Sequence, residues 1–426
     1  MLSLLAQNII QVIDTAFLGR VGEVELGASA LAGIIYIAIY TLAFGFSMGG
    51  QILIGRRNGE QNFHQIGDIV VQGILFLLIP AFLLIPSMQY VAHRWMPNMF
   101  QSEEVSQAVI DYLEWRVFGL VFSFTNTMFR AFYIGIARTK VLTLNAVAMA
   151  LVNVVFDYAL IFGNLGMPQM GISGAALASV IAEFSSTCFF IFYTLKTVPL
   201  EKYGFRHIRF RWLVIRNVLS ISIFMMMQYL LSIGTWMLFF VFIENYLGER
   251  PLAITNIVRS FYTIYTIPSQ ALGSAANTIV SNMMGAKRQH KIPGVLKRIA
   301  TFSFLLILFV AGISLLFPRL LIHIYTDDIS LVNDTVAPLY VLISSLPLYS
   351  VGYVLFSAVS GTGNTRKALT FETITLLFYV AYMSFIIVYS RCSISWAWTT
   401  EHVYWIGLLL FSYIYLKRGR WKDNHI

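Results

Sequence analysis

The chain has 426 residues, of which 58% are hydrophobic and only 12% are charged, and its formal net charge is +9. This hydrophobic content excludes an ordinary soluble protein and is typical of a chain that crosses a membrane several times. No GxxxxGKS/T loop is present, which excludes an ATP-driven pump, and seven scattered histidines argue against a membrane enzyme. The two cysteines lie in or beside apolar segments and predict neither disulfides nor a metal site.

Hydrophobic segments predict an all-α membrane protein with twelve transmembrane helices, because most segments reach the roughly 20 residues that a membrane helix needs. The predicted spans are 1–18, 27–54, 66–92, 105–137, 139–163, 171–196, 213–246, 251–284, 295–325, 332–360, 366–390 and 400–417. The first span is short, since Gly19 follows soon after Met1. We therefore expect the native first helix to begin upstream of Met1.

The first and fifth predicted spans each contain one acidic residue at a matching depth. Asp14 lies five residues before Gly19, where the first span ends, and Asp157 lies six residues before Gly163, where the fifth ends. A carboxylate inside a membrane helix is costly and is by default a functional-site hypothesis. Asn153 lies one helical turn before Asp157, where its amide can hydrogen-bond the acid in either protonation state. The sequence predicts one site here, and the alternative is an acid satisfied by a basic neighbour.

Other ionisable residues also lie inside predicted spans. Glu183 is near the middle of the sixth span, where a proton-relay role and a simple helix contact fit the sequence equally well. Arg130 and Arg259 lie near mid-span and need partners, and Glu183 is the leading candidate partner of Arg130. The alternative is an arginine that admits anionic substrates to a cavity. Glu372 lies near the inner end of its span, and we expect it to extend to the aqueous boundary or to pair there.

The charge of the connections alternates along the chain. One alternating set holds 21 of the 29 Lys and Arg residues, and the other set holds five. Because positive charge stays on the cytoplasmic side, both termini are predicted to be cytoplasmic, with Asp14 and Asp157 in the outer half of the bilayer. The longest basic connection, 197–212, is predicted to be a linker on the anionic inner leaflet between an N-terminal lobe, 1–196, and a C-terminal lobe, 213–426.

The two halves of the sequence repeat at a constant offset, so that adding 226 to a residue number in the first half gives its counterpart in the second. The offset relates Gly22 to Gly248, Leu26 to Leu252, Gln51 to Asn277, Gly59 to Gly285, Gly135 to Gly361 and Thr139 to Thr365. An even number of spans per half predicts parallel repeats, an architecture typical of transporters with a site between the halves. The same offset takes Asp14 to Phe240 and Asp157 to Met383, so the acids belong to the first half alone.

Four motifs resemble the signatures of multidrug and toxic compound extrusion (MATE) transporters. They are DTAFLGRVG at 14–22, the glycine pattern of 45–59, NVVFDYALIFG at 153–163 and the glycine and alanine pattern of 171–179. The resemblance covers essentially the whole chain, and the copies in the second half repeat it. The resemblance implies two lobes of six helices. It also implies export of amphipathic, often cationic compounds in exchange for H⁺ or Na⁺.

The resemblance extends to the DinF-like branch of the family. That branch has its ion site in the N-terminal lobe, which maps here onto Asp14, Asn153 and Asp157. Ser179 stands where the branch often has threonine. The NorM-like branch has additional acids on the seventh and tenth helices, whereas here Gln228 stands in the seventh, and the tenth has only Asp334 at its outer end. We therefore expect no cation site in the C-terminal lobe.

These observations predict a secondary active efflux transporter that exchanges amphipathic compounds for H⁺ or Na⁺. The alternative is a lipid-linked oligosaccharide flippase of the same superfamily, which would need basic cavity residues. The predicted ion-coupling residues are Asp14, Asn153, Asp157, Ser179 and Glu183, with Na⁺ possible at the first three. The predicted substrate-cavity residues are Gln51, Arg130, Gln228, Arg259 and Asn277. We expect a monomer in the bacterial inner membrane, in contact with lipid and substrate, with no cofactor and no nucleic acid.

Overall fold

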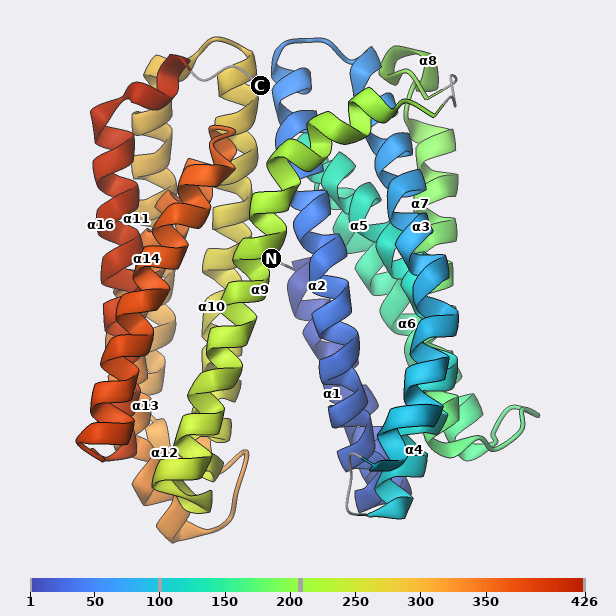
Figure 1. The fold of residues 1–426 in the computed structure, drawn as a ribbon, viewed down its shortest axis with the longest axis vertical. Helices are drawn as coiled ribbons and strands as arrows, with labels where there is room; N and C mark the ends of the chain where they lie inside the picture. The colour runs from blue at the N-terminus through green and yellow to red at the C-terminus, as the bar shows by residue number, and fades with distance from the viewer. Residues whose placement is uncertain (1, 99–101, 206–209, 424–426) are drawn as a thin grey trace. The chain divides into compact units, whose positions relative to one another are not determined.

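The computed structural model describes residues 2–98, 102–205 and 210–423, and within these ranges its regular elements are all helical (Figure 1). The first half contains α1 (Leu2–Val21), α2 (Glu23–Gly59), α3 (His64–Trp95), η1 (Met96–Asn98), α4 (Glu103–Arg116), α5 (Gly119–Gly135), α6 (Lys140–Phe162), α7 (Gly171–Thr197) and α8 (Leu200–Tyr203). Long apolar runs form these helices, as predicted from the sequence.

The fourth predicted span, 105–137, is not one straight helix. It consists of α4 and α5, which meet at an angle of 53°. At the bend the backbone tightens, since Phe118 N donates to Trp115 O at 3.3 Å and Leu120 N donates to Val117 O at 3.1 Å. Such three-residue spacing is characteristic of a tighter helical turn and marks a break in an α-helix. The predicted span is therefore present, but as two helices joined at a bend.

The second half contains α9 (Trp212–Leu247), α10 (Glu249–Gly285), η2 (Gln289–Lys291), α11 (Ile292–Leu316), α12 (Pro318–Ile322), α13 (Ile329–Gly361), α14 (Thr365–Met383), η3 (Ser384–Tyr389), α15 (Ile394–Ala397), α16 (Thr400–Arg418) and η4 (Arg420–Asp423). The predicted span 295–325 is divided into α11 and α12 because Pro318 cannot continue a preceding helix and instead begins the next one. The predicted span 366–390 ends in the π-helical segment η3.

Within the described residues, eight helices are long and apolar enough to cross a membrane, and the bent pair α4–α5 makes a ninth span. Three further helices complete the predicted twelve. The helices α1 and α16 are only 20 and 19 residues long, and α10 spans 37 residues but is more polar. The all-α membrane fold with twelve helices in two sets of six is confirmed.

The internal repeat is also confirmed by the helix boundaries. Helices α2 and α10 are both 37 residues long, and the offset found in the sequence relates their first residues and their last residues alike. Gly135 at the end of α5 lies against the backbone of Gln51, and Gly361 at the end of α13 lies against the backbone of Asn277. The same helix crossing is thus built twice, from positions that the offset relates.

The chain divides into two compact units, Met1–Met226 and Met227–Ile426, called here the first and second units. The boundary falls inside α9 because the beginning of that helix packs on α2, where Ser222 Oγ donates to Phe46 O at 2.8 Å. The division of the lobes predicted at 197–212 follows the order of spans rather than contacts, and it stays a prediction.

Part of the predicted basic linker is held by α3. Arg211 Nη1 donates to Asp68 Oδ2 at 2.7 Å, and the backbone N of Arg211 donates to Gln72 Oε1 at 2.9 Å. Residues 206–209 of the predicted linker lie outside the described residues. The described end of the linker therefore belongs to the packing of the first unit.

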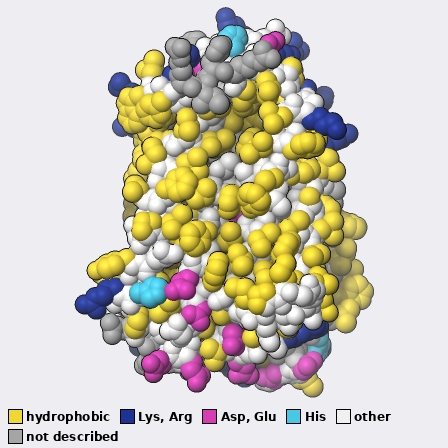
Figure 2. Space-filling view, turned by 90° about the vertical axis from the view of Figure 1, so that its right-hand side faces the viewer, with side chains coloured by type: hydrophobic (Ala, Val, Ile, Leu, Met, Phe, Trp, Pro, Cys, Tyr) yellow, Lys and Arg dark blue, Asp and Glu magenta, His cyan; other side chains and the backbone are white. Residues whose placement is uncertain are grey.

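The surface has the charge distribution of a protein that spans a bilayer. On the face in Figure 2, hydrophobic side chains cover the middle, Lys and Arg gather towards one end, and Asp and Glu gather at the other. Large apolar side chains such as Phe82 of α3 and Phe192 of α7 are exposed, which water would disfavour and lipid would not.

Candidate functional site

The structure brings the three predicted residues of the first and fifth spans together. Asp14 of α1 lies beside both Asn153 and Asp157 of α6. The two helices pack closely, with the rings of Phe17 and Phe162 in edge contact at 5.7 Å. The side chains of Asn153 and Asp157 are fully buried, at 0% exposure, and Asp14 is half-buried. The matching depths read from the sequence thus correspond to a shared location.

The polar atoms of this group are not satisfied by the protein. Both carboxylate oxygens of Asp157, both amide atoms of Asn153 and Oδ1 of Asp14 are buried without a hydrogen bond of ordinary geometry to any described residue. Asp14 nevertheless lies close enough to Asn153 and Asp157 to interact with both. An unsatisfied buried polar group costs about 1–3 kcal/mol, and more when it is charged. Two carboxylates and an amide oxygen are suited to a proton or to a hard cation such as Na⁺.

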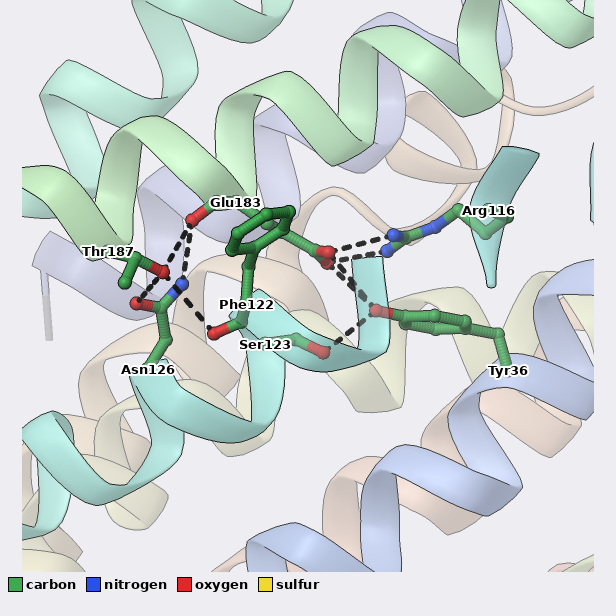
Figure 3. Close-up of polar contacts among 7 residues, drawn as sticks. All are labelled: Tyr36, Arg116, Phe122, Ser123, Asn126, Glu183 and Thr187. Atoms are coloured by element: carbon green, nitrogen blue, oxygen red, sulfur yellow. Dashed lines mark hydrogen bonds and ion pairs between the residues drawn. The ribbon is translucent and has the colours of Figure 1, made fainter. Parts of the chain in front are cut away.

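Glu183 of α7 has a different partner from the one the sequence predicted. Its carboxylate accepts two hydrogen bonds from Arg116, the last residue of α4, with Nη2 at 2.6 Å from Oε1 and Nη1 at 2.9 Å from Oε2 (Figure 3). The assignment of Arg130 as its partner was wrong, because Arg116 of α4 pairs with Glu183 instead. Such a two-pronged contact is among the strongest ion-pair geometries in proteins.

A third helix completes this ion pair. The Tyr36 hydroxyl of α2 lies 3.1 and 3.2 Å from the two Glu183 carboxylate oxygens and 2.9 Å from Ser123 Oγ (Figure 3). The guanidinium of Arg116 also lies 3.7 Å above the centre of the Tyr36 ring. A side chain at Gly119 would collide with both Arg116 and Glu183. Glycine at the start of α5 therefore makes room for the pair.

The backbone around Glu183 is fixed as well. Asn126 Nδ2 of α5 donates to Glu183 O at 3.0 Å, and Thr187 Oγ1 lies 2.9 Å from Asn126 Oδ1 (Figure 3). On the opposite side, Asn145 of α6 exchanges two hydrogen bonds with Ser186, at 3.1 and 2.8 Å. Helix α7 is thus tied to its neighbours at one level.

The two acidic groups of the first unit therefore differ in whether a basic or hydroxyl side chain is bound to the carboxylate. Glu183 has a counter-charge and a hydroxyl donor, whereas Asp157 has neither among the described residues. Arg116 is also within electrostatic range of Asp14, but its Nη1 and Nη2 both donate to Glu183. A group with an unsatisfied carboxylate is the better candidate for reversible binding of a proton or cation.

The remaining predicted residues of the first unit lie on three helices. Ser179 is half-buried, one helical turn before Glu183 on α7. Arg130 of α5 is near Tyr40 of α2, and Gln51 is buried in α2. Among the described residues, no hydrogen bond joins Ser179 to Asp14, Asn153 or Asp157. Its role in ion coupling stays a prediction.

The predicted cavity residues of the second unit have separate surroundings. Asn277 Nδ2 donates to Ser357 O at 3.1 Å across the α10–α13 crossing. Arg259 lies over the ring of Phe240 at 5.4 Å. Gln228 of α9 is buried, and its Oε1 has no hydrogen-bond partner among the described residues. Their shared role in a substrate cavity also stays a prediction.

Two acids of the second unit are buried, Glu372 and Glu401. Glu372 of α14 is 1% exposed and does not extend to an aqueous boundary, because Ser232 and Tyr404 hold its carboxylate inside the unit. The prediction that Glu372 extends to the boundary or pairs there was wrong, because neutral hydroxyl groups hold it inside the unit. Glu401 of α16 is 3% exposed and was not considered from the sequence. It lies at the start of the last span, where an acid is typical of a boundary residue.

A sequence signal for the pair of Arg116 and Glu183 did exist. Each lies about three helical turns into its span, Arg116 counted from 105 and Glu183 counted from 171. Both spans start on the same predicted side, so the two residues share a depth. Arg130 lies about seven turns from the start of its span and therefore much deeper. Counting depth from one common side would have selected Arg116.

Two repeated sets of six membrane helices with unsatisfied acids buried among them define the class of membrane transporters. The MatE family model matches residues 1–159 and 220–386, which is more than half of the chain. The chain therefore belongs to the MatE family of transporters, and the resemblance of its helix motifs to that family is confirmed.

Individual relatives agree over nearly the whole length. The probable multidrug resistance protein NorM of Thermotoga maritima is 22% identical over 440 residues, which cover 99% of this chain and 92% of that protein. A protein of the same description from Synechocystis sp. is 27% identical over 363 residues, covering 82% and 76%. An outward-facing multidrug resistance MATE family transporter of the MOP superfamily has a TM-score of 0.88 at 18% identity, covering 99% and 92%. At this identity, the structural likeness shows the fold.

Proposed function

We propose that the protein is a secondary active exporter that exchanges amphipathic organic compounds for protons by alternating access. The observation that carries the proposal is the unsatisfied group of Asp14, Asn153 and Asp157, buried where α1 packs on α6. Membership of the MatE family and relatives described as multidrug resistance proteins support the export of organic compounds. The location of the acids in the first half supports assignment to the DinF-like branch.

In this proposal Asp157 is the main protonation site, Asn153 orients it and Asp14 shares the charge. A buried ionised carboxylate without a counter-ion is costly, so binding of a proton or of a cationic substrate stabilises the site. Coupling then requires that proton and substrate bind with different affinities to the outward-facing and inward-facing states. A proton taken up from outside drives release of the substrate there, and its own release inside resets the site.

A lipid-linked oligosaccharide flippase is not favoured. Such a protein would hold a pyrophosphate head with basic residues, and only Arg130 and Arg259 were available as predicted basic residues of the cavity. Arg259 lies over an aromatic ring, and the matching family is MatE.

The proposal is tested by efflux from proteoliposomes with pH and Na⁺ gradients imposed separately. The probe is ethidium, a fluorescent amphipathic cation, with a panel of neutral and anionic dyes beside it. We expect a pH gradient to drive ethidium export and a Na⁺ gradient alone to be ineffective. Export driven by Na⁺ alone would contradict proton coupling. Failure of both gradients with every dye would contradict the export of amphipathic compounds.

We further propose that the protein lies in the bacterial inner membrane with both termini in the cytoplasm. The basic connections support this orientation. In a variant without native cysteines, Met167→Cys and Asp327→Cys are expected to react with a membrane-impermeant maleimide in intact cells. Arg288→Cys is expected to react only after permeabilisation. All three positions are exposed, so access alone does not distinguish them. The opposite labelling pattern would reverse the assigned orientation.

A further inference from the structure

The second unit contains two buried acids that the proposed function does not use. Glu372 lies on α14 and Glu401 on α16, and both are almost completely excluded from solvent. Burying an ionised carboxylate is strongly unfavourable unless a counter-charge or several hydrogen bonds compensate for it. The neighbours of each carboxylate therefore decide what the acid can do.

Glu372 is held by two hydroxyl groups through one oxygen only. Ser232 Oγ of α9 donates to Oε1 at 2.5 Å, and the Tyr404 hydroxyl of α16 donates to the same oxygen at 2.6 Å. The second oxygen, Oε2, is buried without a hydrogen-bond partner among the described residues. Tyr229 of α9 and Tyr353 of α13 are the other titratable groups that face this carboxylate.

Glu401 is held in a similar way by neutral donors. The Tyr262 hydroxyl of α10 donates to Oε2 at 2.9 Å, and Trp405 Nε1 donates to the same oxygen at 3.1 Å. The titratable groups that face Glu401 from the surrounding helices are Tyr262 of α10, Tyr349 of α13, Tyr379 of α14 and Tyr404 of its own helix. All of them are tyrosines.

One aromatic cluster connects the two acids. Tyr404 donates to Glu372, Trp405 donates to Glu401, and the rings of these adjacent residues meet edge to face at 4.8 Å. Tyr349 packs on Trp405 at 4.5 Å from another helix. The two carboxylates thus belong to a single apolar environment rather than to two unrelated contacts.

No basic side chain pairs with either acid in the part of the chain that the structure describes. The neighbouring His402 directs Nε2 to Ser344 Oγ at 3.0 Å, and Arg259 lies over a phenylalanine ring. Up to two negative charges therefore remain without a counter-ion. The Arg116–Glu183 pair of the first unit, by contrast, places a base directly against a buried acid.

We propose that Glu372 and Glu401 form a second proton-binding site, in the second unit, where each carboxylate binds one proton from aqueous solution as an O–H bond. A metal ion fits the group poorly, because the Trp405 indole N–H can only donate and no three acidic, histidine or cysteine side chains converge among the described residues. A proton needs no shell of ligands. The proposal goes beyond the proposed function, and it assigns protons to both halves of the protein.

Difference infrared spectroscopy of the full-length protein in lipid nanodiscs tests this site without any transport. The starting variant carries Asp14→Asn and Asp157→Asn, so that the first unit contributes no band from these acids. With carbon-13-labelled glutamate, lowering the pH is expected to produce carboxylic C=O bands. Glu372→Gln and Glu401→Gln should each remove one band, and the double variant should remove both. Glu244→Gln, at an exposed site on α9, is the matched control and should remove neither.

Several outcomes would overturn the proposal. One is a spectrum that neither Gln substitution changes, and another is loss of the bands when Na⁺ replaces choline at constant pH. If the Gln variants do not fold, Tyr404→Phe keeps the ring and removes one donor to Glu372. It should shift the Glu372 band to higher frequency, and no shift would count against the site. If these bands are found while the unmodified protein exports no dye under either gradient, the proposed function alone would be refuted.

Discussion

Replacing Asp157 by asparagine is expected to abolish proton-driven efflux while the protein remains folded in the membrane. The substitution preserves shape and burial but installs a permanently neutral group, so the site can no longer bind and release a proton. Stability should be maintained, because Asp157 has no counter-ion or hydrogen bond to lose among the described residues. In proteoliposomes with an imposed pH gradient, ethidium export should fall to the level of protein-free liposomes.

Two further variants make this result interpretable. Asp327→Asn changes an exposed acid of the connection before α13 and should export at the rate of the unmodified protein. Asp14→Asn should match Asp157→Asn or be milder, since Asp14 is only half-buried. If Asp157→Asn still exported at the original rate, the acid would be structural, and coupling would have to reside at Glu183 or in the second unit.

Removing one member of the Arg116–Glu183 pair is expected to have the largest effect on stability. Glu183→Gln leaves a guanidinium buried without its anion, and Arg116→Gln leaves the reverse. Both side chains are largely excluded from solvent, at 11% and 9% exposure. Breaking such a pair from one side typically costs about 3–5 kcal/mol. We expect each single variant to unfold at a markedly lower temperature, measured in detergent by intrinsic fluorescence.

The double variant Arg116→Met with Glu183→Leu separates lost pairing from lost packing. It should recover part of the stability that the single variants lose, because no buried charge is left alone. The exposed pair of Arg250 and Asp334, at 50% and 49% exposure, provides a matched control. Arg250→Gln should cost only about 0–1 kcal/mol. Equal losses for both pairs, or a double variant no more stable than the singles, would contradict this account.

The architecture was predictable because it depends on long-range patterns. Apolar length determines the spans, and the constant offset between the halves reappears in the matched bounds of α2 and α10. The meeting of Asp14 with Asp157 followed from depth along the helix axis, a quantity that residue counting supplies.

The predictions that were wrong depend on the direction in which a side chain points from its helix axis and on local backbone geometry. The bend between α4 and α5 involves no proline, and its one signal in the sequence, Gly119 at the start of α5, is weak. Glu372 was assigned from its distance to a span end, whereas hydroxyls of α9 and α16 determine its burial. The burial and pairing of such acids depend on neighbouring side chains of other helices. A hydropathy profile carries no information about those neighbours.

The self-contained pairing of Arg116 with Glu183 has an electrical consequence. A membrane potential of 100 mV performs about 2.3 kcal/mol of work on each elementary charge that crosses the whole bilayer. It performs none on a neutral pair that moves as one body. The voltage dependence of a transport cycle should then reflect only the charges of the substrate and of the acids without counter-ions. The ion pair that holds α7 to α4 should contribute nothing to this voltage dependence.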